Sequence, residues 1–193
     1  NTIRLENMRL TEKVHTILTN HLREGDQAID ATAGNGYDTL FLAEQVGPSG
    51  EIIAIDIQDS AIQSTQEKIE SAGLIDRVRL VTDDHAVALK KLITNNVGKV
   101  AAITFNLGYL PGSDKSIQTR AESTKEALAA SIQLLTTGGY LCVTAYRGHS
   151  GGTVEAETVE TFMRKSQSEG HVVDCHQPES SNSPPVLWVL KKN

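Results

Sequence analysis

The sequence predicts an α/β fold with a doubly wound sheet of seven strands, in which the last strand runs antiparallel to its predecessor. Short apolar runs alternate with amphipathic segments from end to end, and the first four apolar runs close on polar residues. Such runs suit parallel strands that helices cover on both faces. The last two runs are joined without a helix, which predicts an antiparallel hairpin at the sheet edge.

Each element follows from its local pattern. The helix at 59–73 begins on an N-cap residue and closes on glycine, and the helix at 37–46 stops before a Gly-Pro pair. The predicted strands cover 27–32, 51–56, 78–83, 100–106, 139–146, 171–177 and 185–192. The predicted helices cover about 9–23, then 37–46, 59–73, 85–93, 123–135 and 154–170.

Length and composition predict one globular domain over 1–193, with 1–25 as a helical extension packed on it. No run of eighteen apolar residues occurs and no secretory signal opens the chain, so we expect a cytoplasmic protein without a membrane partner. Cys142 and Cys175 lie in apolar runs and are expected as buried thiols in neighbouring strands. No cysteine–histidine spacing indicates a metal site.

The stretch "DATAGNG" (30–36) follows the first strand, where ligands of parallel sheets bind. Gly34 and Gly36 permit a tight turn and a close approach to the backbone, and the next helix offers free N–H groups. A nicotinamide fingerprint in this register would need a third glycine where Thr39 stands, and Asp30 would repel a pyrophosphate. A cationic nucleoside ligand fits better, and S-adenosylmethionine is one.

Acidic residues also follow the next two strands. Asp30 would meet the amino end of the methionine part, directly or through water, and Asp56 would accept the ribose hydroxyls. Asp84 and His85 would flank the adenine. Acids often cap helices and strands, but three sets at three strand ends favour a cofactor site. The expected cofactor-binding residues are Asp30, Ala31, Gly34, Asn35, Gly36, Asp38, Thr39, Asp56, Ile57, Gln58, Asp84, His85, Asn106 and Leu107.

These motifs resemble class I S-adenosylmethionine-dependent methyltransferases, which implies a Rossmann-like sheet. The segments "DATAGNGYDTLFLA", "FNLGYLPGSDKSIQT" and "GHSGG" more narrowly resemble a small bacterial family long labelled "putative rRNA methylases". The resemblance covers essentially the whole chain. It implies methylation of 5-aminomethyl-2-thiouridine in tRNA, and it matches His15 to a family position that lies over the cofactor, although a plain helical histidine is the alternative.

The fourth predicted strand delivers Asn106, which we expect to orient the substrate amine, while Tyr109 stacks on the nucleobase. Methyltransferases of exocyclic amines often carry Asn/Asp-Pro-Pro-aromatic here. This chain lacks the proline pair, which is compatible with a flexible side-chain amine. A neutral amine needs no base, and otherwise Asp114 or a water would accept the proton. The expected catalytic residues are therefore Asn106, Tyr109 and Asp114.

Cationic residues follow the fourth and fifth predicted strands, and they would form a local rim for phosphates despite a net charge of −6. A loop in the last hairpin resembles an Asn-Pro-Pro loop of the family. The expected substrate-binding residues are Tyr109, Lys115, Arg120, Arg147, His149 and Asn182.

The sequence thus predicts a methyltransferase that acts on a tRNA anticodon loop. An rRNA or small-molecule amine as substrate, and a non-catalytic nucleoside-binding module, are the alternatives. An NAD-dependent oxidoreductase ranks last because the glycine fingerprint is missing. A homodimer is compatible with the sequence.

Overall fold

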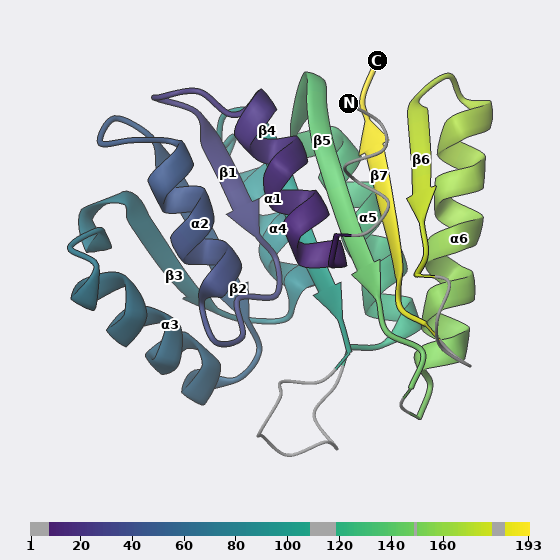
Figure 1. The fold of residues 1–193 in the computed structure, drawn as a ribbon, viewed down its shortest axis with the longest axis horizontal. Coiled ribbons are helices and arrows are strands. Elements are labelled where there is room, and N and C mark those ends of the chain that lie inside the picture. Colours follow the sequence, from purple (N-terminus) through teal and green to yellow (C-terminus); the bar gives the residue numbers. More distant parts are fainter. Residues whose placement is uncertain (1–7, 109–118, 149, 179–183) are drawn as a thin grey trace.

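The computed structural model describes residues 8–108, 119–148, 150–178 and 184–193 (Figure 1). Within these residues seven strands form one sheet in the order β3-β2-β1-β4-β5-β7-β6. The strands are β1 (Gln27–Asp30), β2 (Glu51–Asp56), β3 (Val78–Thr82), β4 (Val100–Leu107), β5 (Leu135–Ala145), β6 (Val172–His176) and β7 (Val186–Lys191).

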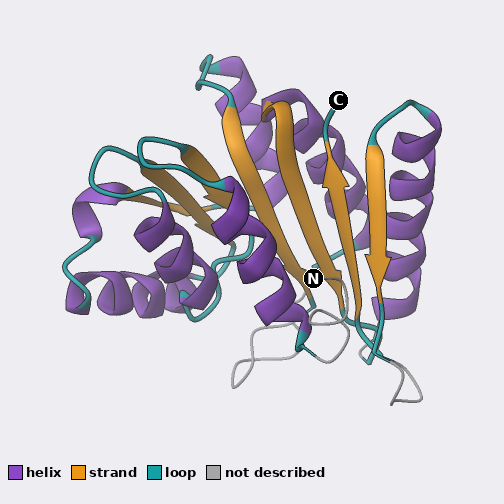
Figure 2. Cartoon of the chain, turned by 45° about the horizontal axis from the view of Figure 1, so that its top comes forward, coloured by secondary structure: helices purple, strands orange, loops and turns teal. Residues whose placement is uncertain are grey.

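The strand directions confirm the predicted topology. β1 pairs in parallel with both β2 and β4, whereas β7 lies antiparallel between β5 and β6. Figure 2 shows the β7 arrow pointing against its neighbours. The other six strands therefore end at one border of the sheet, the lower one in Figure 1, which we call the carboxyl edge.

Six α-helices cover the sheet in the described part of the chain, three on each face. The helices α1 (Leu10–His21), α2 (Tyr37–Gln45) and α3 (Asp59–Ser71) lie on one face, and α4 (His85–Thr94), α5 (Ala121–Leu134) and α6 (Gly152–Ser168) lie on the other (Figure 1). A 3-10 turn (Ile75–Arg77) leads into β3. Among the described residues, no helix combines the length and the apolar character that spanning a bilayer requires.

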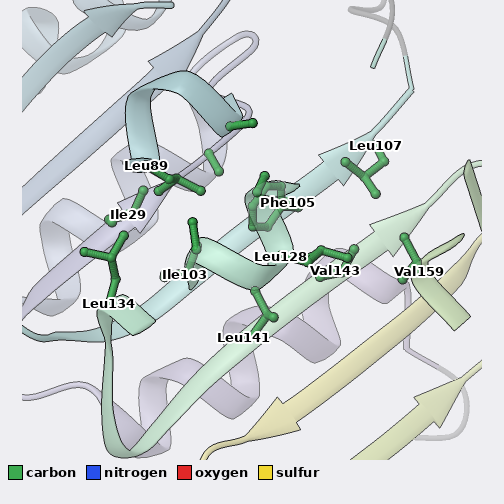
Figure 3. Packing of buried hydrophobic residues seen from close by; sticks show 14 of the residues in the cluster. Ile29, Leu89, Ile103, Phe105, Leu107, Leu128, Leu134, Leu141, Val143 and Val159 are labelled. Carbon is green, nitrogen blue, oxygen red and sulfur yellow. The ribbon is translucent and has the colours of Figure 1, made fainter. Parts of the chain in front are cut away.

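The sheet has a separate apolar core on each face. On the side of α4, α5 and α6, Ile29, Ile103 and Phe105 pack with Leu89 and Leu128 (Figure 3). On the other side, residues of α1 and α2 pack on the alternate residues of the same strands. The two cores fix the helices on both sides of β1 and β4, whose carboxyl ends are thereby held in place.

Two predictions need correction. β5 begins at Leu135, four residues before the predicted start, because Leu135 pairs with Val100 across a register shift and so extends the strand through the glycines. Cys142 is buried but Cys175 is exposed, so the prediction of two buried thiols in neighbouring strands is wrong. Cys175 belongs to the edge strand β6, and β7 separates it from the strand of Cys142.

Leu18 of α1 is fully buried against the sheet, whereas the next residue, Thr19, is exposed. We expect Leu18→Ala to lower the free energy of unfolding by about 2–5 kcal/mol, because it removes buried methyl groups and leaves a cavity. Thr19→Ala is the control and should change it by less than about 0.5 kcal/mol. Urea titrations of both variants measure this, and equal effects would show that α1 is not an integral part of the fold.

Candidate active site

Polar side chains gather at the carboxyl edge, where β1, β2 and β4 end. Asp30 and Asp56 are the last residues of β1 and β2, and Asn106 is the penultimate residue of β4. Asp30 is aligned with Thr104 of β4, so these ends are adjacent in the sheet. Ligands of open parallel sheets bind outside this edge, at the change in strand order that β1 marks here.

The turn after β1 is shaped by two glycines. Gly34 and Gly36 have φ values of 55° and 77°, which side-chain-bearing residues rarely adopt. A Cβ at Gly36 would also lie 2.8 Å from the Cα of Thr65, so α3 packs directly on the turn. The Thr65 hydroxyl donates to the Gly34 carbonyl at 3.1 Å. These contacts with α3 hold the turn in place. The turn leads directly into the N-terminus of α2 at the carboxyl edge.

Asp56 joins this turn to the end of β2. One carboxylate oxygen accepts the N–H of Gly34 at 2.9 Å, and the other accepts the N–H of Gln58 at 2.9 Å. Each oxygen keeps a second lone pair that can accept a ligand hydroxyl. Ile57, which follows, is 58% exposed and offers an apolar surface beside those oxygens. Asp56 can therefore hold a ribose, the role that the sequence predicts for it, and Ile57 can pack against a flat base.

Asp30 lies beneath the turn and is 0% exposed. Its carboxyl group accepts the Thr39 hydroxyl at 2.7 Å and the Thr32 N–H at 3.3 Å. Burial, and then the nearby charge of Asp38, raise the pKa of Asp30 to about 7. Ala31 and Thr39 are likewise buried. The carboxyl group of Asp30 is therefore not exposed at the surface for the predicted ligand contact. Its observed hydrogen bonds hold the turn from below.

Asp38, in the first turn of α2, is the carboxylate that reaches the edge, with a side chain 13% exposed. One oxygen lies 2.7 Å from Nε2 of His15, and the other accepts Nδ2 of Asn106 at 2.7 Å. The imidazole of His15 also stacks on Phe41, with ring centroids 3.8 Å apart. Residues from α1, α2 and β4 therefore meet at one carboxylate, a contact that the sequence did not predict.

Asp84 is the N-cap residue of α4 and His85 is its first residue. The two differ in whether their polar side-chain atoms already have hydrogen-bond partners. Asp84 caps the helix through the N–H groups of Ala86 and Val87, and the Ser123 hydroxyl donates to it at 2.6 Å. Burial opposes ionisation, but the Ser123 hydroxyl and the His85 charge hold the pKa of Asp84 below its ordinary value. The Asp84 side chain therefore serves the helix, and its predicted contact with adenine would compete with these bonds.

His85 is buried, and among the described residues its Nε2 has no hydrogen-bond partner. Burial lowers the pKa of His85, so the ring is neutral near pH 7. It lies edge-on to Phe105, with ring centroids 5.6 Å apart. A buried ring nitrogen without a partner favours a bound group that supplies one. This observation fits the predicted adenine side of a nucleoside site.

Large apolar side chains are also exposed at this edge. Tyr37, Val87 and Val154 lie in the first turns of helices that begin there, and Ile57 and Tyr146 directly follow strands. They therefore lie near the edge outside which ligands of such sheets bind. Tyr146 was not predicted as a site residue. Its N–H donates to the Leu107 carbonyl at 3.1 Å, and burial, then the charge of Asp38, raise the pKa of its hydroxyl. Its signal in the sequence is an aromatic residue immediately after an apolar strand.

The predicted cationic rim is described only in part. Arg120 is exposed directly before α5, and the neighbouring Thr119 is anchored by its N–H to the Gly108 carbonyl at 2.9 Å and by its hydroxyl to Glu155 at 2.7 Å. Arg147 is half-buried after β5. Five predicted residues lie outside the described part of the chain: Tyr109, Asp114, Lys115, His149 and Asn182. Of the remaining predicted cofactor residues, Asn35 and Gln58 are half-buried in their loops, and Leu107 is buried in the core.

Comparisons with known proteins bear on the family and the fold of the chain. A family model described as "Putative rRNA methylase" matches residues 52–191, and one described as "Protein-L-isoaspartate(D-aspartate) O-methyltransferase" matches residues 7–95. A protein of Arabidopsis thaliana named "tRNA (mnm(5)s(2)U34)-methyltransferase, chloroplastic" is 38% identical over 162 residues. That match covers 80% of this chain and 58% of the relative, so the chain spans less than two thirds of that relative's length.

Two solved structures have the same fold over nearly all of the chain. A crystal structure of a "putative rRNA-methylase" from Clostridium thermocellum has a TM-score of 0.90 and 38% identity, and the match covers 96% of this chain and 98% of that one. A "putative methyltransferase" from Streptococcus mutans, solved in complex with SAH, has a TM-score of 0.85 and 32% identity, with coverage of 96% and 99%.

The raised pKa of Asp30 predicts a pH dependence of stability. The unfolded chain loses this proton near its ordinary pKa of 3.8, but the folded protein keeps it up to about 7. Between these values the folded state binds more protons, so this group makes stability fall as pH rises through the window and contributes a constant destabilisation above it. We expect the stability of the wild type relative to Asp30→Asn to decrease from about pH 5 to about pH 8, measured by urea unfolding.

The control for this measurement is Asp76→Asn, because Asp76 is an exposed carboxylate. Its stability relative to the wild type should stay nearly constant over the same range. If Asp30→Asn behaved in the same way, the raised pKa of the buried carboxyl would be contradicted.

Proposed function

The chain belongs to the family described as "Putative rRNA methylase", and on this premise we propose that it is an S-adenosylmethionine-dependent methyltransferase that acts on RNA. We propose further that its substrate is the 5-aminomethyl group of a wobble 2-thiouridine in tRNA. The observation that carries the substrate is the 38% identity to a protein named as a tRNA mnm5s2U34 methyltransferase. The cytoplasm remains our proposal for its location.

The carboxylates and the glycine turn of the carboxyl edge support a site for S-adenosylmethionine. The turn at Gly34 and Gly36, with Asp56 and Ile57 beside it, would hold the nucleoside. His85 would lie on the adenine side, where its buried Nε2 has no partner among the described residues. Asp38 places a partly exposed carboxylate where a cationic methionine part would be attracted. When bound, this cofactor supplies a methyl group on a positively charged sulfur, a good leaving group. The relative solved with SAH supports the same use of the fold.

Asn106 is placed to orient the amine that receives the methyl group. Its backbone N–H donates to the Thr32 hydroxyl at 2.7 Å, and its Nδ2 donates to Asp38, so both the backbone and the side chain are held. Methyl transfer to nitrogen is an in-line displacement, and alignment of the nucleophile is the main contribution that the protein can make. Asn106 would supply it by accepting a hydrogen bond from the amine.

RNA recognition would rely on the surroundings of Asn106. Exposed aromatic rings such as Tyr37 and Tyr146 can stack on unpaired bases of an anticodon loop. Arg120 and Arg147 would contact phosphates, together with Lys115, His149 and Asn182, and Tyr109 and Asp114 keep their proposed roles at the base and as proton acceptor. The family description favours rRNA as the second candidate substrate, and a small-molecule amine is the third.

The purified protein, S-adenosylmethionine and tRNA that carries 5-aminomethyl-2-thiouridine test this function directly. We expect mass spectrometry of the digested nucleosides to show one added methyl group at that nucleoside. Cells that lack the protein should accumulate the unmethylated nucleoside in their tRNA. Methylation of rRNA instead, with an unchanged wobble nucleoside, would replace the narrow substrate and leave the reaction class intact.

Two substitutions should separate cofactor binding from catalysis. Asp56→Ala removes a carboxylate from the nucleoside site and should weaken S-adenosylmethionine binding by about 1.5–3 kcal/mol. Asn106→Ala should leave that affinity within about twofold of the wild type and depress turnover. Isothermal titration gives the affinities and methyl transfer to tRNA gives the turnover. An Asn106→Ala enzyme with normal turnover would remove the amine-orienting role.

A further inference from the structure

We propose that Asp38 fixes the side-chain amide of Asn106 in the one orientation that leaves its oxygen for the substrate amine, and that His15 holds Asp38 in place. Asp38 and His15 are then positioning residues that act through Asn106. The inference rests on the proposed function, because it concerns how an amine is presented for methylation.

The three side chains form a continuous chain of hydrogen bonds. His15 Nε2 lies 2.7 Å from one oxygen of Asp38, and the other oxygen of Asp38 accepts Nδ2 of Asn106 at 2.7 Å. Both carboxylate oxygens are therefore engaged, so the carboxylate cannot turn without breaking a short bond. The residues come from three separate elements, α1, α2 and β4, which the two apolar cores hold in place.

The orientation of Asn106 follows from what each group can do. An ionised carboxylate only accepts hydrogen bonds, so the amide must turn its NH2 group toward Asp38. In the described residues the opposite atom, Oδ1, has no hydrogen-bond partner. An amine that donates a hydrogen to Oδ1 keeps its nitrogen lone pair free to attack the methyl carbon. A reversed amide would donate to that lone pair and block the reaction.

His15 is suited to hold Asp38 because its own position is fixed. Its ring lies almost parallel to that of Phe41, with an interplanar angle of 5°. Since the carboxylate can only accept, Nε2 carries the hydrogen that it donates. The helix α1 thus contributes to the site a group that fixes the second oxygen of Asp38.

The test begins with Asp38→Asn, which keeps the size of the side chain but can both donate and accept. The amide of Asn106 then loses its single preferred orientation. With saturating S-adenosylmethionine, we expect kcat to fall by about tenfold to a hundredfold, the effect of losing a hydrogen bond to a charged group. His15→Phe keeps the ring stack and removes the donor, and it should reduce kcat by a smaller factor.

The reciprocal double variant Asp38→Asn/Asn106→Asp distinguishes positioning from other roles of Asp38. The amide introduced at position 38 can then donate to the new carboxylate at position 106, which keeps an oxygen for the amine. We expect this variant to recover at least about a third of the kcat that Asp38→Asn loses. If Asp38 acted only on the cofactor or on stability, the swap would restore nothing, and the proposal would be overturned.

A readout on the free protein keeps this test independent of the substrate. In the wild type one side-chain amide hydrogen of Asn106 is bonded to a carboxylate, and NMR should show it exchanging at least about tenfold more slowly than in Asp38→Asn. Equal exchange rates would overturn the proposal even if the enzyme methylates tRNA. Slowed exchange in a protein that methylates no RNA amine would instead contradict the proposed function.

Discussion

The carboxylate of Asp56 is the constraint on which the geometry of the site depends. It accepts one backbone N–H from the turn after β1 and one from the loop after β2, so two neighbouring loops share a single anchor. The turn can approach so closely because Gly34 and Gly36 adopt positive φ values and α3 packs on Gly36 without a Cβ between them. The start of α2, and with it Asp38, is placed by this arrangement.

Burial gives two carboxylates of the same segment opposite properties. Asp30 is sealed below the turn, where desolvation and the charge of Asp38 keep its proton up to about pH 7. Asp38 reaches the surface. Burial, and then the charge of Asp38, raise the pKa of Cys142 and of Tyr146. The negative charge that would attract a cationic cofactor therefore comes from Asp38 and Asp56, whereas Asp30 is hydrogen-bonded to Thr32 and Thr39 below the turn.

The sequence predicts the fold well because hydrophobic periodicity and glycine turns are local signals. The alternation of strands and helices and the antiparallel last strand follow from them, and so does the placement of Asp30, Asp56 and Asn106 at one edge. Contacts between residues that are far apart in the sequence leave no such local signal. Ser123 engages Asp84 from another helix, and β7 separates Cys142 from Cys175; neither is visible in a pattern of spacings. His15 and Asp38 are 23 residues apart, and only the packing of α1 brings them together.

The position of Asn106 also explains how the site can lack a proline pair. In an Asn-Pro-Pro sequence the prolines restrict the backbone after the asparagine. Here Leu107 and Gly108 follow it, and Leu107 is buried in the core, while the asparagine itself is held by Thr32 and Asp38. Restraint thus comes from the side chains around the amide, and from the carbonyls of Leu107 and Gly108, which accept the N–H groups of Tyr146 and Thr119.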